Sequence, residues 1–217
     1  MRAATRASQI ACVAICLAVV FAGCGGDGGP PLERPDQPEP PSGKASIVGW
    51  VVSAQDTSVA IPGAQVSANP PSVTQQAGAG GAFRLQNLPA GQIQVTVQPS
   101  VGQAYWPAQF TVTTVEGQET EVVVALIPDS AAVPDRITVQ PNQFSLDPGS
   151  LQTFTVMMWA GSVRSSLAPT WVVEGGVGTM GPPRVGVFHA LKTGEGRIVA
   201  VVGTQTSESK VTVTTPQ

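Results

Sequence analysis

Three short patterns in this sequence match motifs of nucleotide-binding or catalytic sites, and each fails on its context. Residues 176–181 spell G-x-G-x-x-G, but Pro182 and Pro183 follow at once. A dinucleotide site needs this loop to open a helix, which two prolines prevent. Residues 207–210 spell S-x-x-K and residues 192–194 spell K-T-G, the reverse of the order that penicillin-binding enzymes use. We therefore assign neither kind of site.

His189 is the only histidine of the chain. It excludes sites with several histidine ligands and leaves one possible base for a Ser-His-Asp arrangement. His189 follows Phe188 in an apolar segment, so alternation predicts that one of the two faces solvent. No G-x-S-x-G segment is present, and Glu116, Glu119 and Glu121 flank a hairpin turn rather than a cleft. The sequence predicts a non-catalytic protein without a metal site or a cofactor.

The N-terminus has the parts of an export signal. Arg2 and Arg6 precede an apolar run at residues 10–22. This run is shorter than the about 20 residues of a membrane-spanning helix and suits the core of a signal peptide. It ends in Phe21-Ala22-Gly23-Cys24, which resembles the lipobox of bacterial lipoproteins, with Phe where Leu is usual.

This resemblance implies that residues 1–23 are removed and that Cys24 carries a lipid. The lipid would hold the chain on a membrane of the bacterial cell envelope. By the same resemblance, Gly25 favours the outer over the inner membrane in a Gram-negative cell. Cys12 and Cys16 leave with the signal peptide, so neither an intramolecular disulfide nor a thiolate metal site is expected. The alternative is an ordinary signal or a membrane anchor, with Cys24 incidental.

Composition excludes further classes of protein. The 217 residues include 24 Gly and 20 Pro, which disfavour helix interiors and argue against a helical protein. A net charge of −3 leaves no basic face for nucleic acid. Residues 24–44 are rich in Gly and Pro and have almost nothing apolar to bury. They are therefore predicted to form a disordered Gly/Pro-rich tether.

From residue 45 to residue 127, short β-branched segments alternate with Gly or Pro turns, as in a β-sandwich or barrel. The segments that carry a family pattern are Gly49-Trp50-Val51, Ile61-Pro62-Gly63-Ala64-Gln65-Val66, Gly81-Ala82-Phe83-Arg84-Leu85 and Leu88-Pro89-Ala90-Gly91. They resemble the carboxypeptidase regulatory-like (transthyretin-like) domain, which implies an antiparallel β-sandwich. The family often has an Asp before the Phe strand. Residues 75–81 hold no acid here, so nothing supports a calcium site.

Alternation within these segments predicts which side chains are buried. Phe83 and Leu85 share one face of a strand, and Val95 and Val97 share one face of another. The two pairs can fill the space between two sheets. Gly91 is expected to take a positive φ in a tight turn.

Residues 128–134 form a short linker before a second β-rich segment, residues 135–217. Its pattern consists of Ile137-Thr138-Val139-Gln140-Pro141, Pro148-Gly149, Thr170-Trp171, residues 186–190, residues 196–200 and Val211-Thr212-Val213. These features resemble bacterial immunoglobulin-like domains, which implies a second antiparallel β-sandwich with Trp171 in its core. The linker has few groups that could bridge two cores, so each module is expected to fold alone.

Three aromatic residues of the first module are the candidate ligand-binding residues. The family register turns Ile47 and Val51 inward, so Trp50 is expected to face outward. Tyr105 and Trp106 lie in a loop between strands, where exposed rings can stack on sugars or mark a protein interface. The alternative is that the three rings cover an edge or the seam between the modules.

Together these features predict a non-catalytic, lipid-anchored protein of the cell envelope that acts in adhesion, in scaffolding or in presenting a binding surface. Its partners would be the membrane, through Cys24, and protein or glycan ligands, but no nucleic acid. The alternative is a carbohydrate-binding lipoprotein that captures glycans through the aromatic residues of the first module. A platform of coplanar rings would favour the glycan hypothesis, whereas a flat polar surface or a long exposed edge strand would favour adhesion.

Overall fold

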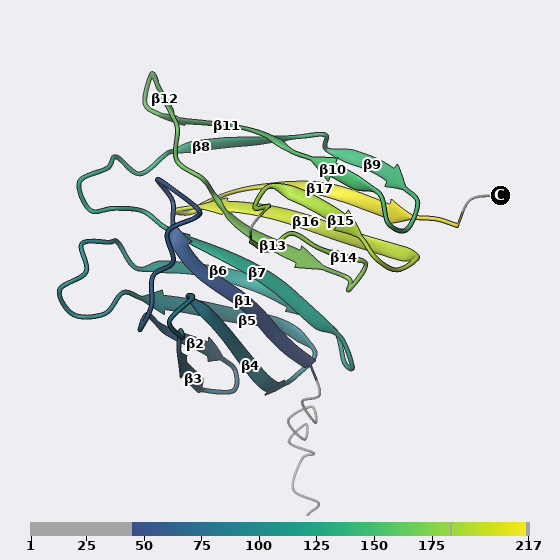
Figure 1. Cartoon of the computed structure of the whole chain (residues 1–217), viewed down its shortest axis with the longest axis horizontal. Coiled ribbons are helices and arrows are strands. Elements are labelled where there is room, and N and C mark those ends of the chain that lie inside the picture. Colours follow the sequence, from purple (N-terminus) through teal and green to yellow (C-terminus); the bar gives the residue numbers. More distant parts are fainter. Residues whose placement is uncertain (1–44, 183, 216–217) are drawn as a thin grey trace, which may run out of the picture. The chain divides into compact units, whose positions relative to one another are not determined.

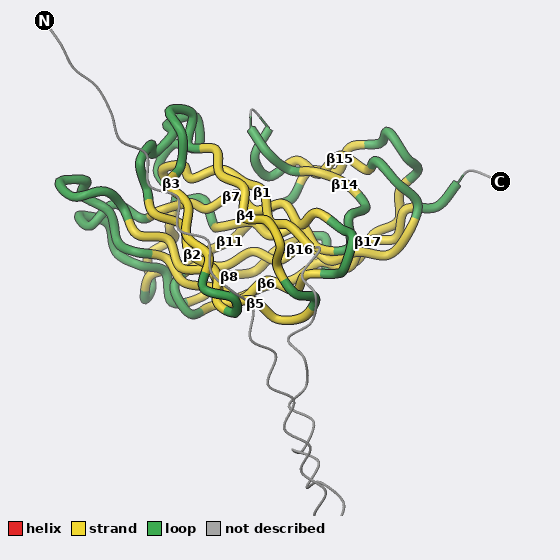
Figure 2. Tube along the Cα trace, turned by 90° about the horizontal axis from the view of Figure 1, so that it is seen from below, coloured by secondary structure: helices red, strands yellow, loops and turns green. Residues whose placement is uncertain are grey.

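The computed structural model describes residues 45–182 and 184–215, which form strands joined by turns and loops (Figures 1 and 2). No helix occurs among these residues, and none of them could therefore cross a membrane as a helix. The predicted all-β fold class is confirmed. The predicted signal peptide, tether and lipidation site at Cys24 lie outside the described residues.

A seven-stranded sheet forms the middle layer, in the order β4-β1-β7-β13-β16-β17-β9. Its strands are β1 (Ala45–Ser53), β4 (Ala82–Leu88), β7 (Glu119–Leu126), β9 (Gln143–Leu146), β13 (Thr170–Glu174), β16 (Gly194–Val202) and β17 (Gln205–Val213). The β1–β7 and β17–β9 pairs are parallel, and the other pairs are antiparallel.

Three smaller sheets cover the middle layer. One has four strands in the order β3-β2-β5-β6, and two have three strands in the orders β12-β11-β8 and β10-β15-β14. The strands of the first are β2 (Gln65–Asn69), β3 (Val73–Gln76), β5 (Gly91–Gln98) and β6 (Ala108–Thr114). Those of the other two are β8 (Arg136–Gln140), β10 (Leu151–Thr153), β11 (Thr155–Ala160), β12 (Val163–Ser165), β14 (Gly178–Thr179) and β15 (Val187–Ala190).

The middle sheet runs through both predicted modules. Strands β4, β1 and β7 come from residues 45–127, and β13, β16, β17 and β9 come from residues 135–217. The two groups meet where β7 pairs with β13, with Val123 opposite Trp171. The division of the chain into modules at residues 45–127 and 135–217 remains a prediction. Each of the two hydrophobic cores takes residues from both halves, which share a sheet and belong to one compact unit. Independent folding of each half stays a prediction.

Each face of the middle sheet has its own hydrophobic core. The four-stranded sheet and one face of β4, β1 and β7 enclose the first core, and the two three-stranded sheets cover the second. As predicted, Phe83 and Leu85 of β4 are buried opposite Val95 and Val97 of β5. Trp171 is buried in the second core, where its ring centroid lies 5.5 Å from that of Phe154.

Strand β7 explains why one segment of the sequence is continuously apolar. Val122, Val124 and Leu126 belong to the first core, whereas Val123 and Ala125 belong to the second. A strand that is buried on both faces needs apolar side chains at every position, so it loses the alternation of a half-exposed strand. Because β7 contributes side chains to both cores, its burial holds the two halves of the chain in contact.

Candidate functional site

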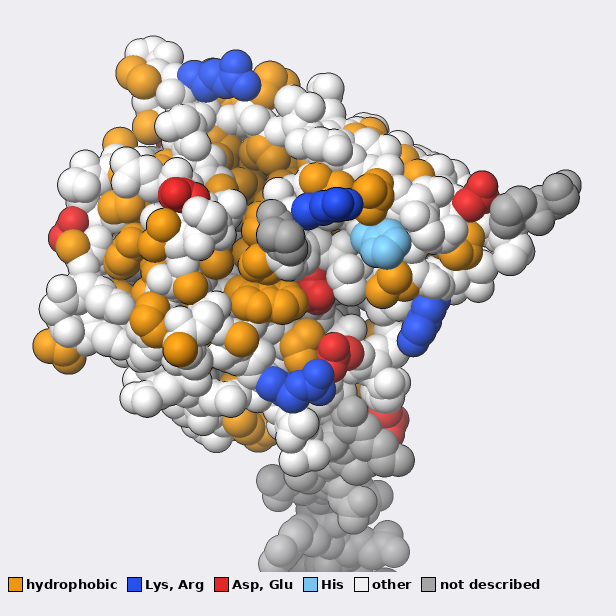
Figure 3. All heavy atoms as spheres, viewed as in Figure 1, with side chains coloured by type: hydrophobic (Ala, Val, Ile, Leu, Met, Phe, Trp, Pro, Cys, Tyr) orange, Lys and Arg blue, Asp and Glu red, His pale blue; other side chains and the backbone are white. Residues whose placement is uncertain are grey.

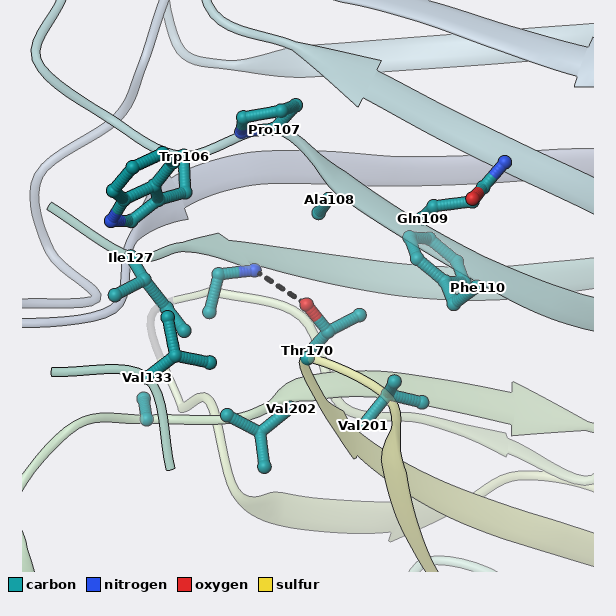
Figure 4. A pocket seen from close by; sticks show the side chains of 13 residues that line it. Trp106, Pro107, Ala108, Gln109, Phe110, Ile127, Val133, Thr170, Val201 and Val202 are labelled. Atoms are coloured by element: carbon teal, nitrogen blue, oxygen red, sulfur yellow. Dashed lines mark hydrogen bonds between the residues drawn. The ribbon is translucent and has the colours of Figure 1, made fainter. Parts of the chain in front are cut away.

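An uncharged groove, here called the Trp106 groove, lies between β6 and the ends of β7, β13 and β16 (Figure 4). Its volume is about 270 Å3. The lining residues are Trp106, Pro107, Ala108, Gln109, Phe110, Ala125, Ile127, Val133, Ala168, Thr170, Val201, Val202 and Gly203. Trp106 lies at one end and Phe110 at the other (Figure 4).

The backbone around Trp106 holds its indole at the rim of the groove. The backbone N–H of Trp106 donates a hydrogen bond to the backbone carbonyl of Ile127 at 2.8 Å, and Tyr105 forms a β-bridge with Pro128. Successive side chains of an extended segment point to opposite sides. Tyr105 packs against the first core, whereas the side chain of Trp106 is 50% exposed. Of the two loop aromatics, only Trp106 offers a ring to a ligand.

The floor of the Trp106 groove is apolar, and its internal polar groups are paired. Phe110 and Val201 are buried beneath it. The backbone N–H of Ala125 donates to the Thr170 hydroxyl at 3.0 Å, drawn as a dashed line in Figure 4. Because no Asp, Glu, Lys, Arg or His lines the groove, a charged group placed there would lose water without gaining a partner. The groove therefore suits an uncharged, apolar group.

Trp50 faces away from the first core, as expected, but it is only half exposed, in line with the alternative that its ring covers the seam between the modules. Ile47 and Val51 are fully buried in the first core, as predicted, so Trp50 points to the opposite face of β1. That face is covered by the second half of the chain, and Trp50 packs against the second core. A methyl group added at Gly181 would collide with the Trp50 ring. The ring is therefore half-buried packing between the two halves.

The three predicted aromatic residues do not share a surface. Trp50 lines a shallow hollow with Ala82 and Arg84, whereas Trp106 lines the groove with Ile127 and Val202. The coplanar platform that would favour glycan binding is not formed by Trp50, Tyr105 and Trp106. Their role in binding remains a prediction, which the geometry supports best for Trp106.

The residues that the second half contributes to the groove were not predicted from the sequence. Thr170, Val201 and Val202 join Trp106 only because β7 pairs with β13 and β13 pairs with β16. Nothing in the spacing of these residues along the chain marks them as neighbours of a loop tryptophan.

A cluster of charged side chains lies at the C-terminal end of β6, beside Thr113. One carboxylate oxygen of Glu174 accepts a hydrogen bond from the Thr113 N–H at 2.7 Å, and the other accepts one from the Arg197 guanidinium at 2.6 Å. Arg197 also bonds to Glu208 at 3.1 Å. Hydrogen bonding to Glu174 is the main cause that raises the pKa of Arg197 above its ordinary value. The cluster ties β6 of the first half to β13, β16 and β17 of the second.

Glu121 of β7 is a second polar link between the halves. Its carboxylate accepts a hydrogen bond from the backbone N–H of Met180. Burial raises the pKa of Glu121 above its ordinary value, and the negative charge of Glu119 adds to this. Hydrogen bonds from the N–H groups of Met180 and Gly181 act in the opposite direction.

Two other observations bear on the remaining candidates. His189 is half-buried beside the fully buried Phe188, which agrees with the predicted alternation. Trp171 lines a hollow of about 430 Å3, but it is only 2% exposed and serves as packing.

On the face in Figure 3, hydrophobic side chains gather toward the middle, and charged side chains are few and scattered. The described residues hold no group of three or more potential metal ligands.

No protein-family model and no curated protein sequence matches this chain. Among solved structures, it is similar to the surface layer protein SbsC, domains 4–9, at 15% identity and a TM-score of 0.34, over 71% of this chain and 22% of that one. A proposed carbohydrate-binding protein from Bacteroides uniformis has 12% identity and a TM-score of 0.33, over 79% of this chain and all (100%) of the other. A Streptococcal ancillary pilin has 16% identity and a TM-score of 0.31, over 79% and 61%. Likenesses at this level carry no inference about function.

Proposed function

We propose that this chain is a non-catalytic, lipid-anchored protein of the bacterial cell envelope that presents a binding surface in adhesion or scaffolding. We further propose that this surface is the Trp106 groove. The observation that carries the proposal is the half-exposed indole of Trp106 beside an apolar, uncharged groove. A tryptophan that a partner can cover is the kind of residue that contributes most to the free energy of protein binding.

The fixed backbone and the apolar surroundings of Trp106 suit this side chain to binding a partner. Its loop is held to the end of β7 by the hydrogen bond from Trp106 to Ile127. A ring fixed in this way loses little conformational freedom when a partner covers it. Val133, which is 45% exposed, extends the apolar rim on the other side of the groove. Val201 and Val202 of the second half line the same groove, so a ligand can contact both halves of the chain at once.

The groove is tested with the full chain in detergent and two panels of immobilised ligands, one of extended peptides and one of glycans. Trp106→Ala should weaken peptide binding by at least about tenfold, since a central interface tryptophan commonly contributes about 2 kcal/mol or more. It should leave the thermal midpoint almost unchanged. Val163→Ala, at a position 68% exposed and outside the groove, is the control. Unchanged binding, or a midpoint lowered by many degrees, would contradict the proposal.

Glycan capture remains the alternative function, and the same experiment separates it. With Trp50 packed between the halves and Tyr105 packed on the first core, Trp106 is the remaining ring for stacking on a sugar. Binding that is confined to the glycan panel and lost in Trp106→Ala would select this alternative over adhesion.

The lipid anchor is tested separately, because it rests on the sequence around Cys24 alone. Cells that express the full chain are labelled with a palmitate analogue and fractionated. The wild type should be labelled and found with the membranes, and Cys24→Ser should lose both properties. Cys12→Ser, within the predicted signal peptide, is the matched control and should behave as the wild type. An unlabelled wild-type chain in the soluble fraction would overturn the anchor and leave the groove to be judged on its own test.

A further inference from the structure

Strand β6 forms an edge of the four-stranded sheet that no strand covers. The order β3-β2-β5-β6 leaves one side of β6 without a strand partner. Proteins commonly protect such edges with charged residues, proline, bulges or very short strands. Between Ala108 and Thr114, β6 has seven residues and contains neither a charge nor a proline. Its composition thus leaves the edge open to pairing.

The hydrogen bond of Thr113 identifies which backbone groups point outward. Its N–H donates to Glu174, so it faces away from β5. In an antiparallel strand, the N–H and C=O of alternate residues point to the same side. Gln109 and Thr111 therefore direct their backbone groups outward as well. Within residues 45–182 and 184–215, neither of these N–H groups donates to a loop or to a side chain.

The space beside this edge lies over a part of the middle sheet that is only partly covered. The four-stranded sheet packs over β1 and β7 and reaches β13. The next strand, β16, carries Val199 and Val201 on the same face, and Val199 is only half-buried. A strand added to β6 would lie about 4.8 Å beyond it and about 10 Å above β16. Gln109 and Val201 both line the Trp106 groove, which extends into this space.

We infer that the open edge of β6 pairs with an extended, uncharged segment of a partner protein. The segment adds a fifth strand to the four-stranded sheet and places an apolar side chain in the Trp106 groove. This inference rests on the proposed function, and it specifies the partner as a peptide backbone with apolar side chains at alternate positions. A peptide backbone is expected because the outward N–H and C=O groups of Gln109 and Thr111 can pair with one. Apolar side chains are expected because no charged residue lines the groove.

Charge and geometry limit the length of the added strand. At the end near Thr113, the Glu174 carboxylate already occupies the outward N–H, and Arg197 and Glu208 lie beside it. Pairing must stop there, so the contact involves only the residues opposite Gln109 and Thr111. A charged side chain in the groove would be desolvated without a partner, which excludes strongly charged segments.

The test uses the full chain in detergent and a synthetic acetylated peptide of alternating threonine and valine, seven residues long. Amide hydrogen exchange of Gln109 and Thr111 should slow by at least about tenfold when the peptide binds. A peptide that is N-methylated at alternate residues on the pairing side should bind at least about tenfold more weakly, because it cannot form the ladder. A peptide with lysine in place of valine should not bind.

Three results would overturn strand addition. These are absence of binding at millimolar peptide, equal binding of the N-methylated peptide, and binding that leaves the exchange of Gln109 and Thr111 unchanged. The peptide controls need no change in the protein, so they remain decisive if a variant fails to fold.

Protein variants separate this inference from the proposed function. Thr111→Pro removes an outward N–H without touching the β5 pairing, and proline is tolerated at edges. Thr111→Val keeps the N–H and is the control. If Trp106→Ala weakens peptide binding and Thr111→Pro does not, strand addition is wrong and the binding surface stands. If neither variant weakens it, both fail. A concentration-dependent dimer that Thr111→Pro abolishes would assign the edge to a second copy and overturn the proposed partner.

Discussion

The Glu174 carboxylate of β13 accepts a 2.7 Å hydrogen bond from the backbone N–H of Thr113 in β6. The two residues belong to different halves of the chain, and the bond joins the edge of the four-stranded sheet to the middle sheet. Glu174 is 7% exposed, and its other carboxylate oxygen binds Arg197. Loss of this carboxylate would leave the half-buried N–H of Thr113 without a partner and Glu208 as the remaining ion-pair partner of Arg197.

Glu174→Ala should therefore lower the free energy of unfolding by about 2–3 kcal/mol, as expected when hydrogen bonds to a charged group are lost. This loss is smaller than the loss on breaking a fully buried ion pair, because the Arg197 side chain is 42% exposed. Urea denaturation of the purified protein measures the loss. Glu208→Ala removes the exposed partner of Arg197 and should cost less than about 1 kcal/mol. Equal losses in the two variants would contradict a special role for Glu174.

Trp171→Ala should lower the free energy of unfolding by about 3–5 kcal/mol, because it opens a cavity in the second core beside Phe154. Both halves should melt together in one transition at a lower temperature, since β13 pairs directly with β7. Trp159→Ala is the matched control, because Trp159 is only half-buried and stacks on Arg136. Differential scanning calorimetry that shows a melted second half beside an unperturbed first half would contradict this prediction.

Residues 45–134 and residues 135–217, produced as separate chains, should each be less stable than the whole. Separation exposes the β7–β13 edge and the faces of Val123 and Val172 that the other half covers. Mixing the two chains should restore the near-ultraviolet circular dichroism of the intact protein. If each chain unfolds cooperatively at the midpoint of the whole, the shared sheet does not contribute to stability.

Gly49→Ala should destabilise the protein by more than about 3 kcal/mol, because a methyl group there would collide with the carbonyl oxygen of Val122. Strand β1 lies between β4 and β7, so neither backbone can move away freely. Gly80→Ala is the control, because nothing lies within 4 Å of a methyl group at that position. Soluble yield and the urea midpoint distinguish the two. A Gly49→Ala protein as stable as Gly80→Ala would show that the strands are packed less closely than described.

Glu121→Gln should change the pH dependence of stability. Folding raises the pKa of Glu121 through burial, with the charge of Glu119 adding to it. The folded chain then holds this proton more tightly than the unfolded chain does. The stabilisation is complete below the ordinary pKa of 4.5 and is lost as pH rises through the folded value.

Relative to the wild type, the Glu121→Gln variant should therefore gain stability as the pH rises above 4.5. The gain is about 1.4 kcal/mol for each unit by which the pKa is raised. Denaturation curves at several pH values measure it, and Glu195→Gln controls for the loss of one exposed charge. A difference between variant and wild type that is constant with pH would contradict the raised pKa.

Local sequence determined much of the strand structure. Gly and Pro at 44 positions, from 24 and 20, leave little room for helices, and the all-β class follows from that composition. Alternation placed Phe83 with Leu85 and Val95 with Val97 on buried faces, because side chains along a strand repeat every two residues whatever the strand pairs with. Gly91 has a φ of +120°, as its place in a tight turn required.

Tertiary structure alone decided what covers each outer face. Alternation shows that Trp50 points away from Val51, but it cannot show that Gly181, far along the chain, lies against the ring. That contact exists because β7 is buried on both faces and pairs with β13, which brings the second half over the outer side of β1. The same pairing brings Val201 into the groove that Trp106 borders. Such contacts depend on which strand edges meet, and strand pairing is set by the burial of whole faces rather than by the spacing of residues in one segment.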